Sequence, residues 1–412
     1  MKTSRSVTQD QQRRRIVFAW NYVQWGGAQV YFLAIMKVAQ KDWDILVILP
    51  RTSSPEMIRY LSELNIEHHL VDYELDTQSA RTLARKLRRQ FNRIKIEWRT
   101  YLELLRFDVR NTVFQIEVAP WQSVTFLTAM ALRGAKVFLT MHNFLPDAPL
   151  WRRLVWKGRF QFVSRLPGIN FFCSNEDTKN RLRGWVNDEF WNRIRVTFTA
   201  VNPPQIAEAA SAPFDRRNIL KKHGVSPDDL IVLCVGQFID RKGRWIFLEA
   251  AQRVLSAEAG ISFVWLTPQL PSAEEEARIA DFALGEKFRI VLSETLGKDR
   301  LDVLRFFRIA DIFALPSYVE GLPIALLEAM ALGIPSISTN VYAIPEAVKD
   351  METGILIPAG DAVALATAIV TLKNDLDLRK RLASVGREYV VQKFDEREAA
   401  ASAIEAYSEA LT

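Results

Sequence analysis

The stretch from Glu320 to Gly333, EGLPIALLEAMALG, describes a short helix that is entered by an acidic loop. Pro323 suits the first position of a helix, and Gly333 suits the position just past its end. Every residue from 324 to 332 except Glu328 is apolar, and a helix that is apolar on all sides is a buried helix. The stretch therefore predicts a helix in the interior of a folded domain.

The two carboxylates of this stretch predict a ligand site. Burying Glu328 is costly unless another group satisfies its charge, and it lies only about 8 Å along the axis from the helix start. That start presents free backbone N–H groups and the positive end of the helix dipole, which bind anions. A sugar nucleotide needs amides for its diphosphate and carboxylates for its hydroxyl groups. Alternatively, Glu328 caps a turn in the core and Glu320 is an ordinary loop charge.

Length and composition bound the class of protein. A chain of 412 residues fits two domains, and an apolar content of 49% with 25% charged residues is typical of a soluble globular protein. Cys173 and Cys234 both lie in apolar runs, which indicates small buried residues and a reducing compartment. Residues 1–15 lack the apolar region of a signal peptide, and no run is long enough to span a membrane. We expect a cytoplasmic protein, soluble or peripheral to the membrane.

Charge is distributed unevenly between the two halves. Residues 1–200 hold 31 Lys and Arg against 18 Asp and Glu, which gives +13. Residues 201–412 hold 23 against 30, which gives −7, and the two values sum to the net charge of +6. A basic first half and a mildly acidic second half predict different partners for the two halves.

Two series of short apolar runs alternate with helix-like stretches along the chain. This alternation predicts parallel sheets that are covered on both faces by helices. Paired prolines and small residues at 202–213 indicate a break between the two series. The predicted strands are 16–20, 45–49, 112–116, 136–141 and 168–173 in the first series, and 230–235, 261–266, 288–292, 311–315, 336–338 and 354–357 in the second.

Glu320 and Glu328, with seven residues between them, resemble the signature of retaining glycosyltransferases of the GT4 type. Gly321, Pro323 and the run Glu-Ala-Met-Ala-x-Gly are part of the same signature. The resemblance is strong over residues 230–400 and weaker over residues 13–205. The flanking runs that keep the family's order and spacing are 310–317, 333–338, 344–346 and 354–358.

The resemblance implies the GT-B fold, in which two doubly wound Rossmann-like domains face each other across a cleft. Residues 1–205 would bind the acceptor, residues 213–391 would bind a nucleotide-diphosphate sugar, and a helix over 392–412 would pack back onto the first domain. The acceptor would be a glycan or a lipid-linked glycan of surface polysaccharide or glycolipid synthesis.

The resemblance also assigns roles within the signature. Glu320 would hold the sugar or support the positive charge that develops on it, and Glu328 would accept hydrogen bonds from the ribose. The helix start at Gly321, Leu322, Pro323 and Ile324 would bind the diphosphate. Attack would occur on the front face, with the departing phosphate accepting the proton of the acceptor.

A second donor-binding loop is expected after the run 230–235. Gly236 permits a tight turn there, and Arg241 and Lys242 are cations that can meet a diphosphate. Relatives usually have Arg where Gln237 stands, which leaves open whether Arg241 supplies the missing charge or the site binds its donor more weakly. The alternative is a solvated turn with two basic residues. The chain also departs from the family pattern at 267–271 and at 342–343, near the expected nucleotide side.

In the first half, Gly26 and Gly27 follow the first predicted strand and His142 ends a later one. A pair of glycines allows a ligand to approach the backbone closely, although it can also be a simple turn. His142 matches the cleft histidine of the family and would contact the donor sugar or orient the acceptor. The alternative for His142 is a structural hydrogen-bonding role.

Neither a metal ion nor another cofactor is expected. Asp42 and Asp44 form an Asp-x-Asp pattern, but they precede a strand instead of following one, and His68 and His69 have no ligand spacing around them. The charge of the leaving diphosphate would then be balanced by Arg241, Lys242 and the amides of the helix start.

Two basic stretches interleaved with aromatic residues lie at 81–110 and 151–165. Both suit an amphipathic surface on anionic lipid, at about 1 kcal/mol for each basic residue near the headgroups. The alternative is an ordinary helix with its aromatic stripe packed inward. Nucleic acid is not expected, because no recognition motif accompanies the charge.

Two other functions are compatible with this architecture. A sugar-nucleotide epimerase would need a pair of acid and base carboxylates in the first domain, where the sequence shows no obvious pair. A non-catalytic scaffold that binds nucleotide or a partner is favoured by Gln237 and the altered turns, and disfavoured by the presence of Glu320, Glu328, Lys242 and His142.

Overall fold

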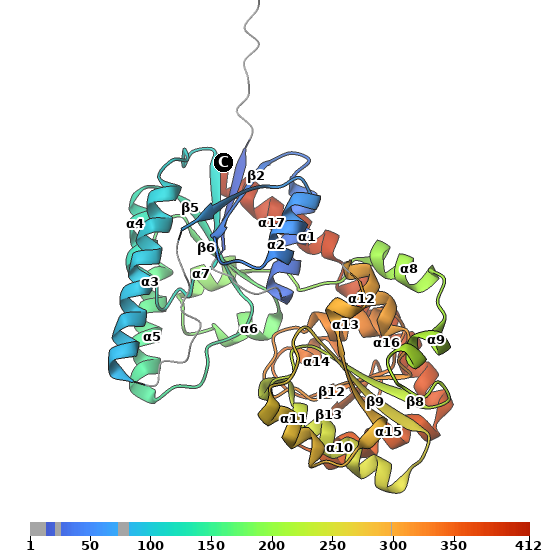
Figure 1. Ribbon diagram of the computed structural model, residues 1–412. Coiled ribbons are helices and arrows are strands. Elements are labelled where there is room, and N and C mark those ends of the chain that lie inside the picture. The colour runs from blue at the N-terminus through green and yellow to red at the C-terminus, as the bar shows by residue number, and fades with distance from the viewer. Residues whose placement is uncertain (1–13, 21–25, 73–81, 298) are drawn as a thin grey trace, which may run out of the picture. The chain divides into compact units, whose positions relative to one another are not determined.

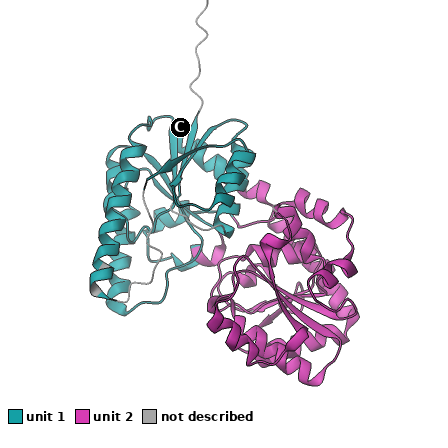
Figure 2. Ribbon diagram, in the orientation of Figure 1, with its two compact units in different colours: residues 1–173, 179–197, 400–412 teal, residues 174–178, 198–399 magenta. Residues whose placement is uncertain are grey.

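The computed structural model describes residues 14–20, 26–72, 82–297 and 299–412 of the chain (Figure 1). The chain forms two compact units, coloured separately in Figure 2. Unit 1 comprises Met1–Cys173, Lys179–Thr197 and Ala400–Thr412, and unit 2 comprises Ser174–Thr178 and Phe198–Ala399. Most of the N-terminal stretch that was interpreted as lacking a signal peptide lies outside the described residues.

Unit 1 is built on a seven-stranded parallel sheet with the strand order β3-β2-β1-β4-β5-β6-β7. The five runs predicted for this half are confirmed as strands, because each is a buried apolar run. The edge strands β3 and β7 were not predicted: β3 reads EHHLV and is largely exposed, and β7 has only two residues. The strands are β1 Arg15–Ala19, β2 Asp44–Pro50, β3 Glu67–Val71, β4 Thr112–Ile116, β5 Lys136–Met141, β6 Ile169–Cys173 and β7 Arg195–Val196.

Helices cover the sheet of unit 1, and polar caps begin several of them. Ser54, Thr82 and Asn187 each accept a hydrogen bond from a backbone N–H of the first turn. The helices are α1 Gly27–Ala39, α2 Pro55–Glu63, α3 Leu83–Leu104, α4 Val124–Leu132, α5 Leu150–Val163, α6 Glu176–Arg181, whose first residues belong to unit 2, and α7 Asp188–Arg193.

The C-terminal helix α17, Glu396–Leu411, contributes residues 400–412 to unit 1. Ala400 and Ala403 are fully buried, and their small side chains allow the helix backbone to approach its neighbours closely. The ring of Tyr407 packs edge-on against Phe138 of β5, and its hydroxyl donates a hydrogen bond to Gln115 Oε1 at 2.8 Å. Strands near the chain start and the last helix therefore share one core.

Unit 2 contains a six-stranded parallel sheet with the order β10-β9-β8-β11-β12-β13, and all six predicted runs are strands. The strands are β8 Leu230–Val235, β9 Ile261–Thr267, β10 Phe288–Leu292, β11 Ile312–Leu315, β12 Ser336–Thr339 and β13 Ile355–Ile357. The helices are α8 Pro203–Ser211, α9 Arg216–Lys222, α10 Arg244–Ala257, α11 Ala273–Ala280, α12 Arg300–Phe307, α13 Ile324–Ala331, α14 Ile344–Ala347, α15 Ala362–Asn374 and α16 Leu376–Lys393.

The paired prolines at 203 and 204 do not interrupt the chain as the sequence analysis expected. They occupy the first turn of α8, and Asn202 caps this helix by accepting a hydrogen bond from Gln205 N at 2.9 Å. Proline is tolerated at this point because the first N–H groups of a helix lack an intrahelical acceptor. The change from unit 1 to unit 2 lies between Thr197 and Phe198 instead.

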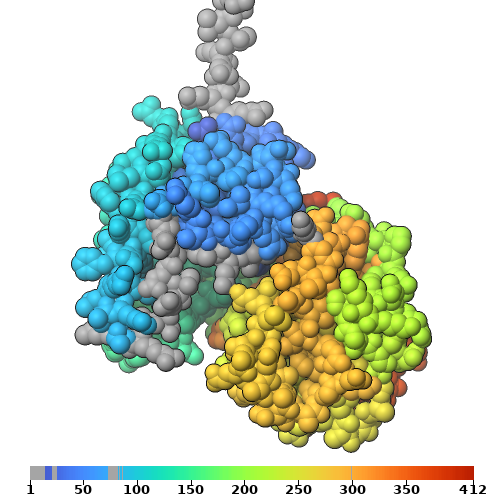
Figure 3. All heavy atoms as spheres, in the orientation of Figure 1, coloured from blue at the N-terminus to red at the C-terminus, as the bar shows by residue number. Residues whose placement is uncertain are grey.

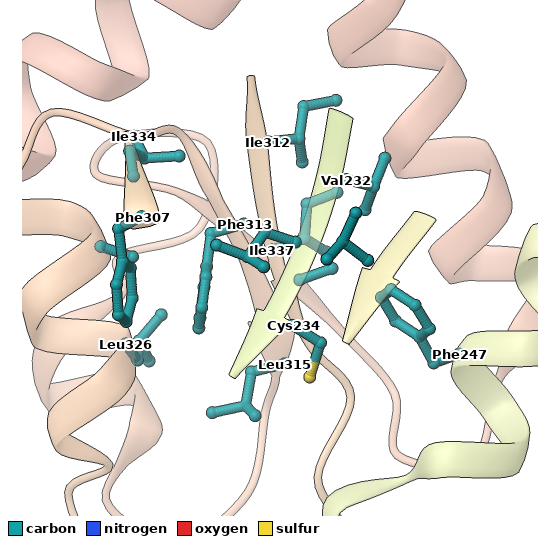
Figure 4. Packing of buried hydrophobic residues seen from close by; sticks show 14 of the residues in the cluster. Val232, Cys234, Phe247, Phe307, Ile312, Phe313, Leu315, Leu326, Ile334 and Ile337 are labelled. Carbon is teal, nitrogen blue, oxygen red and sulfur yellow. The ribbon is translucent and has the colours of Figure 1, made fainter. Parts of the chain in front are cut away.

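The core of unit 2 surrounds the apolar helix α13, as its composition predicts. Figure 4 shows Leu326 of this helix near Phe307 of α12, and Leu315 of β11 close by. Leu326, Leu327, Ala329 and Ala331 are all fully buried. Among the helices of the described residues, none combines the length and the apolar character that a membrane span requires.

Candidate active site

The strand order of unit 2 reverses between β8 and β11, which are neighbours in its sheet. Ligands of open parallel sheets bind outside the carboxyl ends of the strands at such a switch point. Two loops leave the sheet there: the loop after β8, which contains the short 3-10 helix Asp240–Lys242, and the loop that leads from β11 into α13. These loops carry most of the residues that the sequence predicted to bind the donor.

Backbone contacts hold the two loops together. Tyr318 N donates to Arg241 O at 2.9 Å, and Arg241 Nη1 donates to Val319 O at 3.1 Å. Gly243 has a φ of 73°, and a Cβ atom at this position would lie 1.9 Å from Pro316 O. Only glycine fits here, because both the left-handed backbone and the close approach exclude a side chain. Gly243 thus fixes one loop against the other, a role that the sequence analysis did not assign to it.

Glu320 lies at the centre of the polar contacts between these loops. Its side chain is only 6% exposed, and Lys242 Nζ lies 2.6 Å from Glu320 Oε1. Ser317 Oγ donates to the same oxygen at 2.8 Å, and Arg241 Nη1 lies 3.6 Å from Oε2. A carboxylate with this set of donors is held in one orientation. The structure thus brings Glu320, Arg241 and Lys242 together, and adds Ser317, which was not recognised.

Gly236 borders the same lysine. Its φ is 147°, and a Cβ atom built on it would lie 3.4 Å from Lys242 Cε. A Cβ atom there would make an ordinary van der Waals contact with Lys242, so the positive φ is what favours glycine at position 236. Gly236 N donates to Leu266 O at 2.9 Å, which ties the start of the loop to β9.

The start of α13 follows Glu320 directly. Pro323 is the N-cap and not the first helical residue, and its carbonyl accepts from the N–H groups of Leu326 and Leu327. The N–H groups of Ile324 and Ala325 precede the first intrahelical bond, so they are available for an anion by helix geometry. Gly321 and Ile324 are partly exposed, whereas Leu322 is buried and anchors the turn.

Glu328 lies one turn into the buried part of α13, and its carboxylate forms an ion pair with Arg300, the first residue of α12. The Glu328 side chain is 7% exposed and that of Arg300 is 21% exposed. Burial raises the pKa of Glu328, and the charge of Arg300 opposes this rise. Arg300 thus offsets the free-energy cost of burying the charge of Glu328. Arg300 was not predicted, since no local pattern connects it to Glu328.

In unit 1, His142 follows β5, and the rings of Tyr31 and Phe32 from α1 pack edge-on against it at 5.4 and 5.7 Å between centroids. Its Nε2 atom lies 3.9 Å from Glu117 Oε2, just after β4. Burial lowers the pKa of His142 to about 4, so the ring is neutral near pH 7.

A buried polar chain leads from α17 to the neighbourhood of His142. Tyr407 donates to Gln115, and Gln115 Nε2 lies 3.0 Å from Thr140 Oγ1 and 3.2 Å from Glu117 Oε1. Glu117 and Gln115 were not singled out by the sequence analysis. Alternating polar residues at the end of β4, in the run QIE, would have been the only signal for them.

Gly26 and Gly27 stand at the start of α1, with Gly26 as its N-cap. The backbone of Gly26 is extended, and a Cβ atom there would meet only Gln29 Oε1 at 3.4 Å. Among the residues that the structure describes, neither strain nor packing therefore requires glycine at 26. Close approach of a ligand stays a prediction for this pair.

Two of the residues considered and set aside as metal ligands have protein partners. Asp44 pairs with Arg15 at 3.6 Å, and His69 lies 3.2 Å from Glu67. Across the described residues, no group of three or more His, Cys, Asp or Glu side chains converges on a point that could hold a metal ion.

Comparison with known proteins agrees with this architecture. Residues 215–389 match the model of the family described as Glycosyl transferases group 1. The chain is 26% identical over 212 residues to a D-inositol 3-phosphate glycosyltransferase of Paenarthrobacter aurescens, covering 52% of each chain. It is 34% identical over 167 residues to the amylovoran biosynthesis glycosyltransferase AmsK of Erwinia amylovora, covering 38% of this chain and 39% of AmsK. These matches span about half or less of the relatives' length.

The fold is similar to that of Anabaena Alr3699/HepE, solved in complex with UDP-glucose, with a TM-score of 0.74 at 16% identity. That similarity covers 96% of this chain and all of the Anabaena chain. The two parallel α/β units are those of the GT-B fold, which confirms the predicted fold class. Residues 215–389 thus match the glycosyl transferases group 1 family, the GT4 type that the sequence resembled.

Proposed function

We propose that this protein is a retaining glycosyltransferase that moves a sugar from a nucleotide-diphosphate sugar to a glycan or a lipid-linked acceptor. The observation that carries the proposal is the arrangement of Glu320 and Lys242 beside the start of α13, at the switch point of unit 2. The match to the family and the fold shared with a UDP-glucose complex support a nucleotide-sugar donor.

Lys242 is the proposed partner of the donor diphosphate. Its side chain is 13% exposed, so its charge is weakly screened by water, and it is already oriented by its 2.6 Å contact with Glu320. When the bond between the sugar and the diphosphate breaks, negative charge grows on the leaving oxygen. Lys242, Arg241 and the N–H groups of Ile324 and Ala325 would stabilise that charge without rearrangement. In this proposal no metal ion is required.

Glu320 is the proposed partner of the sugar. A diphosphate bound to Lys242 shares that cation, which leaves one carboxylate oxygen of Glu320 available for a sugar hydroxyl or for the positive charge at the anomeric carbon. In the reaction the acceptor oxygen forms a bond to the anomeric carbon on the face from which the diphosphate leaves. The acceptor's proton passes to the departing phosphate oxygen, so no protein base takes part.

Glu328 and His142 have supporting roles in the proposal. Glu328, held by Arg300, would accept hydrogen bonds from the ribose hydroxyls. His142 is neutral near pH 7, so it would exchange a hydrogen bond with a sugar hydroxyl or the acceptor and would add no charge. Gly26 and Gly27 would let a ligand approach the start of α1.

The acceptor class rests on the names of relatives. AmsK is described as an enzyme of amylovoran biosynthesis, and we propose a corresponding role in the synthesis of a surface polysaccharide or glycolipid. The proposed location is the cytoplasm, at the inner face of the membrane. Two buried free cysteines support a reducing compartment.

A panel of sugar nucleotides tests the function, with released nucleoside diphosphate and isomerised sugar measured separately. We expect one donor to release its nucleoside diphosphate, and Lys242→Met to weaken its binding at least tenfold, since a charge-assisted hydrogen bond contributes about 1.5–3 kcal/mol. Glu320→Gln should lower turnover more than donor affinity. Lys380→Met, an exposed lysine on α16, is the matched control and should change neither.

Three results would contradict the proposal. Isomerised sugar without nucleotide release would identify an epimerase. Donor binding without turnover, even with acceptor glycans present, would identify a scaffold. Turnover that is unaffected by both Lys242→Met and Glu320→Gln would remove the proposed site from the mechanism.

A further inference from the structure

Helix α5 exposes an apolar face that the folded unit leaves uncovered. Leu150 is 72% exposed, Trp151 65% and Leu154 60%, and Val155 and Phe162 are also exposed. At 100° per residue these five side chains and Gly158 project on one side of the helix. Phe160 and Val163, on the opposite side, are fully buried in the core of unit 1. The helix thus has two apolar faces, and only one of them has a partner within the described residues.

Basic side chains border this outer face on both sides. Arg153 and Lys157, four residues apart, lie along the edge next to Leu150 and Leu154. Arg152 and Arg159, seven residues apart, lie along the other edge, and all four are exposed. Helix α5 contains no acidic residue. An apolar face between two rows of cations is typical of a helix that lies in the interface of a bilayer.

Helix α3 repeats this pattern over 22 residues. Arg88 and Lys95 lie in a row beside its apolar stripe, and both are exposed. The stripe follows the spacing of one helix face, and Phe91 in it is 75% exposed. The stripe consists of Leu87, Phe91, Ile94, Trp98, Leu102 and, at the C-cap, Leu105. The side chains of α3 form part of the outer surface of unit 1, cyan in Figure 3.

Both helices are attached to the same segment of unit 1, residues 121–123. From α5, Phe160 stacks on Trp121 and Arg159 Nη1 donates to Trp121 O at 2.9 Å. From α3, Arg93 donates to Gln122 at 2.7 Å, and Glu97 accepts from Ser123 at 2.7 Å. Shared attachment places the two helices on one side of the unit, as Figure 1 shows.

We propose that α3 and α5 together dock unit 1 on an anionic lipid bilayer, with the apolar face of α5 inserted among the acyl chains. Charge complementarity identifies the occupant: the cations beside the apolar faces match anionic headgroups, while Trp and Phe suit the boundary below them. In the described part of the chain, every exposed Trp and Phe side chain belongs to these two helices. Such a cluster of exposed aromatic side chains is unusual on a protein surface that contacts only water. The surface is separate from the proposed donor site in unit 2, so it can be tested independently.

The test is flotation of the full-length protein with vesicles of phosphatidylglycerol and phosphatidylcholine in equal parts, at low and high salt. We expect binding that weakens with salt and with loss of the anionic lipid. Leu154→Glu should weaken binding at least tenfold, because it places a charge in the inserted face. Arg153→Gln with Lys157→Gln should weaken it roughly 20- to 30-fold at low salt. Phe91→Glu should weaken binding if α3 shares the surface.

Matched controls separate docking from nonspecific effects. Val363, near the start of α15 in unit 2, is 55% exposed, and Val363→Glu should bind vesicles as the unaltered protein does. Lys221→Gln with Lys222→Gln removes two exposed cations from α9 and should have no effect at matched salt. All these positions are exposed, so circular dichroism and melting should show folded variants.

The proposal fails if the unaltered protein stays unbound, or if the α5 variants bind vesicles as well as the controls do. It also fails if the protein forms a dimer that Leu154→Glu dissociates while vesicles have no effect, because the occupant is then a second copy of this chain. If the protein binds vesicles of phosphatidylcholine alone and salt does not weaken this binding, electrostatic attraction to anionic lipid is excluded as a contribution to docking.

Discussion

Units 1 and 2 share one architecture, yet their polar residues are used differently. In unit 2 the buried carboxylates of Glu320 and Glu328, at the start of α13 and within it, each pair with a cation. In unit 1 the cations lie mostly outside, beside exposed apolar helices, and the buried polar groups near His142 are largely neutral. This difference fits the two proposals, a small charged ligand for unit 2 and a lipid surface for unit 1.

The net charges of the two halves fit this difference. The +13 of residues 1–200 includes the exposed basic residues of α3 and α5. The −7 belongs to residues 201–412, most of which form unit 2, although the site of that unit presents cations. Local geometry and not net charge therefore determines what the switch point of unit 2 can bind. Three predictions test this difference between the buried polar groups of the two units.

The largest effect is expected at the contact between the two loops of unit 2. Gly243→Ala adds a Cβ atom 1.9 Å from Pro316 O at a left-handed residue, and we expect a loss of roughly 3–5 kcal/mol in the stability of unit 2. Gly260→Ala is the control, since its φ of 72° is similar and nothing lies within 4 Å of the added atom; it should cost about 1–2 kcal/mol. Hydrogen exchange of unit 2 peptides measures both. Equal losses in the two variants would mean that the loops are not held by this contact.

The next effect concerns the buried ion pair of unit 2. Arg300→Met leaves Glu328 without its cation, and we expect a cost of about 3 kcal/mol, because removing one partner leaves an uncompensated buried charge. Adding Glu328→Gln should restore most of this stability, and urea unfolding of both single variants and the double variant measures the coupling. Glu328→Gln alone should weaken donor binding by about 1–3 kcal/mol. Unchanged donor affinity would assign Glu328 a structural role only.

The smallest effect is expected in unit 1, at His142. An unfolded chain binds a proton at His142 near pH 6.5, whereas burial lowers the pKa in the folded protein to about 4. The unfolded state therefore binds more protons between these pH values, so stability should fall by about 1–3 kcal/mol as the pH drops from 6.5 towards 4. His142→Gln should remove most of that loss, and the exposed His69→Gln should retain it, as measured by urea unfolding at several pH values. A smaller part should remain in His142→Gln because burial also lowers the pKa of His223. An undiminished loss in His142→Gln would mean that the proton binds at another group.

Much of the fold was predictable because strands and buried helices carry local patterns. The eleven predicted runs are all strands, and α13 is buried as its composition indicates. The edge strands β3 and β7 were missed because an edge strand does not need a continuous apolar run. The prolines at 203 and 204 were misinterpreted because proline occurs both where a helix or strand ends and in the first turn of a helix.

The candidate site was only partly predictable. Gly236, Arg241, Lys242 and Glu320 carry a motif, and the structure brings them together. Ser317 and Gly243 lie beside the motif. Ser317 donates to Glu320 within its own loop, whereas the role of Gly243 depends on a contact between two loops that are about 75 residues apart in the sequence. Periodicity could not tell whether the aromatic residues of α5 face inward. The structure divides them, with Phe160 buried and Trp151 exposed.

What the sequence determined by itself is local: which runs form strands, which helix is apolar on all sides, and which loops carry glycine and charge. These properties follow from the spacing of side chains along the chain, which secondary structure converts directly into faces. Only the tertiary structure decided that Arg300 compensates Glu328 and that Gly243 meets Pro316. It also decided that the outer faces of α3 and α5 have no partner among the residues of unit 1 that the structure describes. Such contacts join residues distant in the sequence, so their energies depend on distances that no local pattern specifies.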